Sequence, residues 1–147
     1  MELIRYQVFV HENIADEFIA GVKKEFQRIT DSIGGDPQDP STTFGPLATK
    51  VQYDRVNSFI EQGKKEGSEI IQGGGKHESA GNYIPPTIFK NPGPGASVYE
   101  EEIFGPVLCV QTFTDETEAI RLANNTQFGL AGNIFALCAI CNELTQL

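Results

Sequence analysis

A near-continuous apolar run, Val107–Phe113, is the feature that most restricts the fold of this chain. Because apolar and polar residues do not alternate along it, the run predicts a β-strand covered on both faces, as in a parallel sheet. Asp115 follows closely and Glu118 stands three residues later, a pattern typical of the first turn of a helix. A doubly covered strand followed by a helix predicts an α/β fold with a mostly parallel sheet and flanking helices.

The first half of the chain shows the same alternation of strand and helix patterns. A short β-rich run at residues 6–10 precedes a predicted helix that starts at Asn13. A second amphipathic helix is predicted over about residues 50–66, and a short strand over residues 68–72. The apolar residues expected to face the core are Ile14, Phe18, Ile19, Val22, Phe26 and Ile29 in the first helix and Val51, Val56, Phe59 and Ile60 in the second.

Two further segments are expected to extend the sheet. Residues 83–90, YIPPTIFK, predict an extended segment that its two prolines confine to a sheet edge or an irregular path. Residues 130–137, LAGNIFAL, predict a second buried strand after the helix that Asp115 begins, in parallel pairing.

The net charge and the length of the chain limit the kinds of partner that it can bind. The 147 residues suit one domain, and 20 acidic residues against 11 Lys and Arg give a net charge of -9. Such a charge repels nucleic acids and anionic membranes, so neither is an expected partner. No apolar run reaches the roughly 18 to 20 residues that span a bilayer, and the N-terminus lacks the pattern of a signal peptide, so we predict a cytoplasmic chain.

The three cysteines do not predict a metal or redox site. Cys138 and Cys141 form a C-x-x-C pair, but a second pair of ligands is missing, since His11 and His77 are distant in sequence. Cys109 lies within the predicted buried strand and is expected to be a small core residue. An odd number of cysteines without scaffold spacing fits a reducing compartment.

Several stretches taken together resemble the NAD(P)-dependent aldehyde dehydrogenase family. They stand in the family's order and at about its spacing: FVHENIADEF, GDPQDPSTTFGPLAT, VNSFIEQGKKEGSEIIQGGG, GNYIPPTIF, EEIFGPVLCVQTF and NNTQFGLAGNIF. The resemblance implies that residues 7–135 are part of the family's catalytic domain and that residues 136–147 are a divergent end. It also implies an oxidoreductase that oxidises an aldehyde substrate to a carboxylic acid with NAD or NADP, through a cysteine nucleophile and a glutamate-activated water.

The motif EEIFGP carries the candidate site residues. By its match to the family, Glu102 is the glutamate whose carboxylate accepts hydrogen bonds from the nicotinamide ribose hydroxyls, and Phe104 is the aromatic residue beside the nicotinamide. Without the resemblance, a run of three acids reads as a solvated turn and Phe104 as a core residue. Glu100 and Glu101 are expected to stay solvated.

Gln52 and Arg55 are the other two candidates. They match helix positions that reach the cofactor's ribose and phosphate region in some family members. Solvated polar residues on a helix surface are the alternative, and both interpretations stay open.

The resemblance also predicts what the chain lacks. The family's nucleophilic cysteine is expected near Glu2, where the sequence MELIRYQ has none. The leading hypothesis is therefore a family fragment without activity of its own. The alternatives are a binding module that associates with full-length relatives, some of them mitochondrial, and a gene fragment without function.

Overall fold

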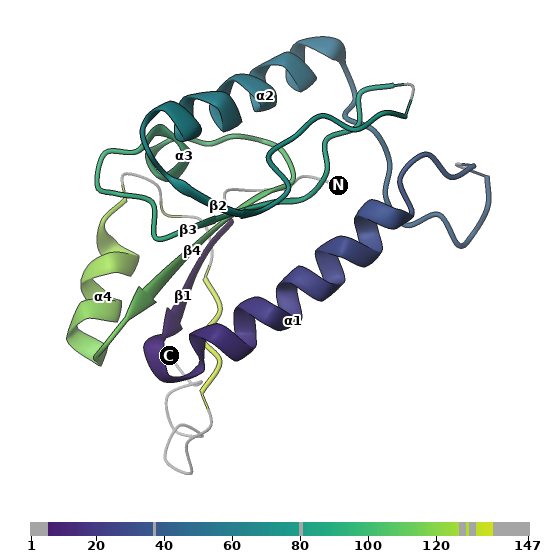
Figure 1. The fold of residues 1–147 in the computed structure, drawn as a ribbon. Coiled ribbons are helices and arrows are strands. Elements are labelled where there is room, and N and C mark those ends of the chain that lie inside the picture. Colours follow the sequence, from purple (N-terminus) through teal and green to yellow (C-terminus); the bar gives the residue numbers. More distant parts are fainter. Residues whose placement is uncertain (1–5, 37, 80, 127–128, 130–131, 137–147) are drawn as a thin grey trace.

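The computed structural model describes residues 6–36, 38–79, 81–126, 129 and 132–136. It forms an α/β fold whose four-stranded sheet lies between helices (Figure 1). The elements in chain order are β1 (Tyr6–His11), α1 (Glu12–Asp31), α2 (Lys50–Lys65), β2 (Glu69–Gln72), β3 (Thr87–Lys90), α3 (Ser97–Glu100), β4 (Val107–Phe113) and α4 (Glu116–Asn124). The predicted fold class is confirmed.

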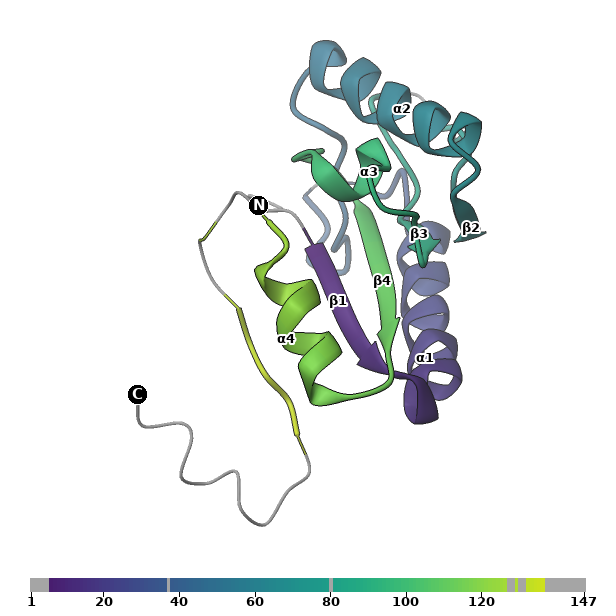
Figure 2. The same cartoon turned by 90° about the vertical axis from the view of Figure 1, so that its left-hand side faces the viewer.

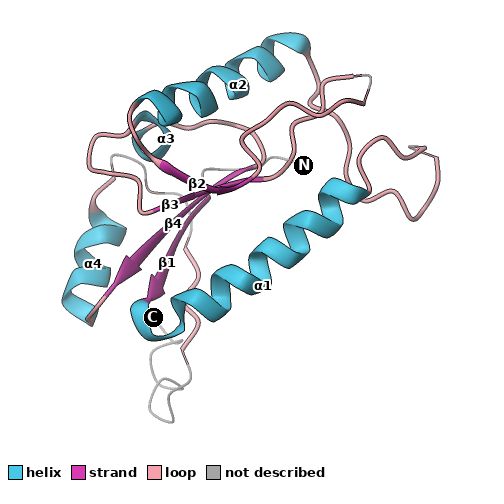
Figure 3. Ribbon diagram, viewed as in Figure 1, coloured by secondary structure: helices cyan, strands magenta, loops and turns pink. Residues whose placement is uncertain are grey.

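The sheet is mostly parallel and is organised around β4. Its strand order is β1-β4-β3-β2 (Figure 3). Strands β1 and β3 both pair with β4 in parallel, and β2 pairs with β3 antiparallel. Because β4 has a hydrogen-bonded neighbour on each side and its first four residues are buried, it is the covered strand that its apolar run predicts.

The alternation of side chains along the strands divides the core into two layers. Phe89 on β3 pairs with Cys109 on β4, and both belong to the core layer that faces α2 and α3. Ile88 pairs with Leu108 one position away, and both belong to the layer under α1. Neighbouring residues on a strand point to opposite faces, so one continuous apolar run supplies both layers.

Side-chain caps fix the starts of the three longer helices. His11 caps α1 by accepting a hydrogen bond from the Asn13 backbone N–H at 3.2 Å. Thr49 caps α2 in the same way, through the N–H of Gln52. The predicted capping residue Asp115 accepts from the Glu118 N–H at 2.9 Å and so starts α4.

The Glu118 carboxylate closes the turn before α4. It accepts hydrogen bonds from the backbone N–H and the hydroxyl of Thr114, both at 2.9 Å. These bonds, the backbone one first, hold the pKa of Glu118 below its ordinary value.

Several predictions made from local patterns are wrong. For residues 83–90, the predicted irregular path is found at residues 83–86, but the predicted edge position is not: β3 lies inside the sheet, because Pro85 and Pro86 precede the ladder and leave it intact. Val51 is 80% exposed on α2, and Ile14 is 56% exposed on α1. An apolar residue at a helical spacing packs inward only where a neighbouring element covers its side of the helix.

The second buried strand is also absent from the part of the segment that the structure describes. Residues 132–136 have no regular secondary structure, and Ile134 and Phe135 are 96% and 94% exposed. The rest of the predicted strand lies outside the described residues. A strand after α4 has no place beside β4, because β1 and β3 already occupy both edges of that strand.

Within the described ranges, every helix is too short or too polar to cross a lipid bilayer.

Two glycines inside helices give opposite predictions. A Cβ on Gly63 of α2 would lie 2.7 Å from Val98 Cγ1 and 2.9 Å from Phe89 Cε1, whereas a Cβ on Gly21 of α1 would meet nothing within 4 Å. We expect Gly63→Ala to lower the free energy of unfolding by about 1–3 kcal/mol through overpacking. Gly21→Ala should raise it by about 0.5–1 kcal/mol, because alanine is the better helix former. Denaturant titration of both variants measures this, and an unchanged stability of Gly63→Ala would contradict the close packing of α2 on the sheet.

Candidate functional site

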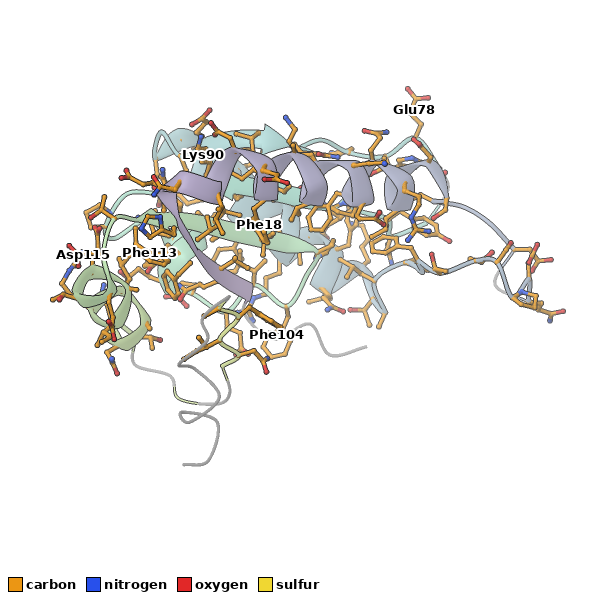
Figure 4. All side chains as sticks on the ribbon, turned by 90° about the horizontal axis from the view of Figure 1, so that it is seen from below. Phe18, Glu78, Lys90, Phe104, Phe113 and Asp115 are labelled. Carbon is orange, nitrogen blue, oxygen red and sulfur yellow. The ribbon has the colours of Figure 1, made fainter. Side chains whose placement is uncertain are left out.

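The candidate site is the loop of residues 101–106, which joins α3 to β4. Its residues alternate between the surface and the core. Ile103 and Gly105 are buried, whereas Glu102 is half-buried and Phe104 is 41% exposed (Figure 4). Ile103 belongs to the core layer under α2, so the core anchors the loop and leaves the side chains on either side of Ile103 at the surface.

The two ends of the loop are fixed by close packing and by the sheet. A Cβ on Gly105 would lie 2.6 Å from Val56 Cγ2, so the loop backbone lies directly against the fully buried Val56 of α2. At the end of the loop, the carbonyl of Pro106 accepts a hydrogen bond from the Thr87 N–H at 2.9 Å. The loop is therefore attached both to a helix and to the neighbouring strand β3.

Side chains of α2 hold the backbone of the loop. Gln52 donates from Nε2 to the carbonyl of Phe104 at 2.8 Å, and Arg55 donates from Nη2 to the carbonyl of Glu102 at 3.0 Å. Residues three apart lie on one face of a helix, so both donors reach the same loop. The Arg55 guanidinium also lies over the ring of Phe59, with Cζ 5.6 Å from the ring centroid.

The conformation of Phe104 shows why this loop needs such support. Its φ is 56°, in the left-handed region that residues other than glycine rarely adopt. A residue held there costs of order 1–3 kcal/mol and persists only where its surroundings fix it. The bond from Gln52 to the Phe104 carbonyl and the close contact of Gly105 with Val56 provide that fixation on the two sides of the Phe104 peptide.

A second contact from α2 positions the short helix before the loop. Ala96 has no side chain that can cap α3, and Glu66 takes this role from the end of α2. Its Oε2 accepts from the backbone N–H of Ser97 at 2.8 Å and from the Ser97 hydroxyl at 3.0 Å. Hydrogen bonds from the Gln62 side chain and then from Ser97 hold the pKa of Glu66 below its ordinary value.

Neither α3 nor its cap is among the predictions made from the sequence. Helix α3 has four residues, too few for a periodic pattern to stand out. Its cap comes from a residue 31 positions away along the chain, and local capping patterns do not show it. The glutamine side chain of Gln7 adds another long-range contact, donating to the carbonyl of Tyr99 at 2.9 Å.

The structure thus brings the four candidate residues Glu102, Phe104, Gln52 and Arg55 together. Gln52 and Arg55 donate hydrogen bonds to backbone carbonyls of the loop. The two interpretations made from the sequence, solvated surface residues and residues in contact with the cofactor, did not include these bonds. The carboxylate of Glu102 accepts no hydrogen bond and forms no ion pair within the described residues, and Glu100 and Glu101 are exposed. Contact of these residues with a cofactor stays a prediction.

Cys109 is a core residue and not a nucleophile at this site. It is 3% exposed on β4, and its Sγ donates to the carbonyl of Val98 at 3.2 Å. Over the part of the chain that the structure describes, no three His, Cys, Asp or Glu side chains come together as metal ligands would. Cys138 and Cys141 lie outside the described residues.

Comparison with known proteins shows which family the chain belongs to. The model of the aldehyde dehydrogenase family matches residues 5–138. The chain belongs to the aldehyde dehydrogenase family. Betaine aldehyde dehydrogenase from Sinorhizobium fredii is 43% identical over 132 residues, which are 88% of this chain and 26% of the relative. A probable betaine aldehyde dehydrogenase from Schizosaccharomyces pombe is 38% identical over 131 residues, with the same coverage.

Solved aldehyde dehydrogenase structures share the fold. A mutant of the Bacillus cereus enzyme matches with a TM-score of 0.83 and 32% identity, over 94% of this chain and 28% of that one. The NAD+ complex of the Bacillus cereus enzyme matches with a TM-score of 0.76 and 35% identity, over 84% of this chain and 25% of that one. The chain spans about a quarter of the length of the curated relatives it matches.

The tether from Gln52 gives a prediction for the loop. We expect Gln52→Ala to lower the free energy of unfolding by about 0.5–1.5 kcal/mol, the usual net contribution of one hydrogen bond. Amide hydrogen exchange at Ile103 and Phe104 should become faster, because the Phe104 carbonyl loses its partner. Gln27→Ala is the matched control, since Gln27 on α1 bonds only the side chain of Asp31 among the described residues. Unchanged exchange in the loop of the Gln52 variant would contradict the tether.

Proposed function

We propose that this chain is part of the catalytic domain of an NAD(P)-dependent aldehyde dehydrogenase, and that Glu102 and Phe104 contact the nicotinamide riboside end of the cofactor. One observation carries the proposal: the carboxylate of Glu102 has no protein partner within the described residues, while its backbone is fixed from α2 by Arg55. A carboxylate that is not engaged in an ion pair, on a backbone held by a hydrogen bond from α2, is suited to a ligand.

The chemistry of the two side chains fits that ligand. A carboxylate offers two acceptor oxygens, which match the two adjacent hydroxyls of a ribose. Such charge-assisted hydrogen bonds are shorter and stronger than neutral ones. The exposed ring of Phe104 next to it offers an apolar face to a planar nicotinamide. Gln52 and Arg55 hold the loop that carries both side chains, and a direct contact of either residue with the cofactor stays a prediction.

The proposed reaction oxidises an aldehyde to a carboxylic acid, and NAD or NADP supplies the hydride acceptor when bound. Curated relatives are named betaine aldehyde dehydrogenases, so betaine aldehyde is the first substrate to try. A thiolate is needed to attack the aldehyde carbon, and the segment MELIRYQ, where the family's nucleophile is expected, has no cysteine. Cys109 is buried and bonded to Val98. We therefore propose that the 147-residue chain by itself does not turn over.

The turnover prediction is tested by mixing the purified chain with NAD or NADP and betaine aldehyde or a simple aliphatic aldehyde. We expect no reduced cofactor, measured by its absorbance, above a protein-free control. Steady formation of reduced cofactor in proportion to the protein concentration would contradict the inactive chain.

Cofactor binding is tested separately from turnover. We expect NAD to bind the chain weakly in a calorimetric or NMR titration, and Glu102→Gln to weaken binding by about tenfold. The substitution replaces hydrogen bonds to a charged group, worth roughly 1.5–3 kcal/mol, by neutral ones worth roughly 0.5–1.5 kcal/mol. Glu101→Gln is the matched control, because Glu101 is an exposed neighbour with the same charge. Equal losses in the two variants would show a general effect of charge and contradict a specific role of Glu102.

A second candidate function is a binding module that associates with full-length relatives. It is supported by exposed apolar side chains at the site end of α2, where Val51 is 80% and Phe104 is 41% exposed. Mixing the chain with a full-length aldehyde dehydrogenase and measuring the mass of the species by size exclusion tests this. If neither cofactor nor relative binds, a gene product without its own function is the remaining explanation.

We expect the chain in the cytoplasm, since its cysteines fit a reducing compartment.

A further inference from the structure

Side chains from two strands of the sheet reach the short helix α3, which leads into the loop of residues 101–106. Gln7 on β1 is half-buried and donates from Nε2 to the carbonyl of Tyr99 at 2.9 Å. Cys109 on β4 donates from Sγ to the carbonyl of Val98 at 3.2 Å. Gln7 and Cys109 are paired in the register of the two strands, so both side chains leave the same face of the sheet. Neighbouring strands therefore contact two consecutive carbonyls of α3.

These contacts fall on carbonyls that a helix cannot satisfy by itself. The last four carbonyls of a helix have no partner within it. In α3, which has four residues, the carbonyl of Ser97 accepts from the N–H of Glu101, and the carbonyls of Val98 and Tyr99 come after it. Val98 and Tyr99 are both buried, and a buried carbonyl without a hydrogen bond is costly. The side chains from the sheet supply hydrogen bonds at this end of α3.

The bond from Gln7 lies between two places that α2 holds. Upstream, Glu66 of α2 accepts from the N–H of Ser97 at the start of α3. Downstream, Arg55 of α2 donates to the carbonyl of Glu102. The Tyr99 carbonyl is between these two points along the chain, and its bond comes from the sheet instead of from α2. The segment that enters the loop is therefore held from two sides.

Strand β1 begins beside this segment. Strands β1 and β4 are parallel, and Tyr6 pairs with Leu108, so both strands start at the same end of the sheet. In Figure 2, α3 lies near the end of the sheet where β1 and β4 begin. Gln7 is the second residue of β1, and it links the start of this strand to the segment that leads into β4.

We propose that Gln7 is a positioning residue for the cofactor contacts: it fixes α3 through the Tyr99 carbonyl, and through α3 the side chains of Glu102 and Phe104. The φ of 56° at Phe104 is a conformation that persists only where its surroundings fix it. Without the bond from Gln7, Gln52 and Arg55 still hold two carbonyls of the loop, but the chain that enters the loop is free to shift. The inference rests on the proposed function for what the two side chains bind, whereas the effect of Gln7 on the loop needs no cofactor.

The first test is amide hydrogen exchange on the 147-residue chain without cofactor. Gln7→Met keeps the length of the side chain and removes the donor. We expect the amides of residues 99–101, which are hydrogen-bonded in α3, to exchange about threefold faster, the effect of losing one hydrogen bond. The amide resonances of residues 102–104 should shift. The amide of Ala119, bonded to Asp115 at the start of α4, should exchange at an unchanged rate, since a general loss of stability would accelerate it equally.

Three further variants separate positioning from stability. Gln7→Lys keeps a donor and should restore slow exchange at residues 99–101. Gln7→Asn, whose amide is one methylene short of the carbonyl, should behave like Gln7→Met. Val8→Ala is the matched control in the same strand, because Val8 points to the opposite face and packs in the layer under α1. We expect Val8→Ala to change the exchange of residues 99–101 and of Ala119 together, without shifting the resonances of the loop.

The link to the cofactor is tested by titration with NAD. We expect Gln7→Met to weaken NAD binding by about threefold and Val8→Ala to leave it unchanged. If the unsubstituted chain binds no NAD, the proposed function fails, and the exchange measurements alone decide the role of Gln7.

Two results would overturn the proposal. The first is exchange at residues 99–101 that Gln7→Met and Gln7→Asn leave unchanged, or accelerate no more than that of Ala119, since Gln7 would then contribute to stability alone. The second is faster exchange in Gln7→Met together with undiminished NAD binding, since α3 would then not position the residues that contact the cofactor.

Discussion

The pairing of β4 on both of its sides is the constraint on which the rest of the structure depends. Hydrogen bonds to β1 and β3 fix its backbone, and its alternating side chains supply both core layers. A one-residue shift in its register would exchange the residues of the two layers, so the packing of α1 below and α2 above selects a single register. The loop of residues 101–106 ends where this strand begins, and therefore takes its position from the most buried part of the chain.

Helix α2 connects the sheet to the candidate site. Its buried residues Val56 and Ile60 seat it on the sheet, which places Gln52 and Arg55 over the loop and Glu66 at the start of α3. Three polar side chains of one helix therefore act on backbone groups of one segment. In this candidate site the carbonyls of Glu102 and Phe104 are held by hydrogen bonds, while their side chains lie at the surface. A flexible acidic turn would have no such support for its backbone.

The sequence predicted well those features that local patterns determine. The covered strand at Val107–Phe113 and the cap at Asp115 depend on neighbouring residues, and both are present. The interior position of β3 and the exposure of Val51 depend on which element lies alongside, which a local pattern does not contain. The four candidate site residues came from a family resemblance. Their grouping was implied, but the bonds from Gln52 and Arg55 to carbonyls 52 and 47 positions away had no local signal.

The strained backbone at Phe104 connects the fold to the proposed chemistry. A φ of 56° is unfavourable for a phenylalanine, and a loop free to relax would abandon it. With this φ held, Ile103 is buried while the side chains of Glu102 and Phe104 stay at the surface. If the φ of Phe104 relaxed, the backbone would change direction there, and the side chains of Glu102 and Phe104 would no longer keep their relative positions. The hydrogen bonds from α2 thus stabilise a conformation that the loop would not adopt alone, and the relative placement of a carboxylate and an aromatic ring follows from that conformation.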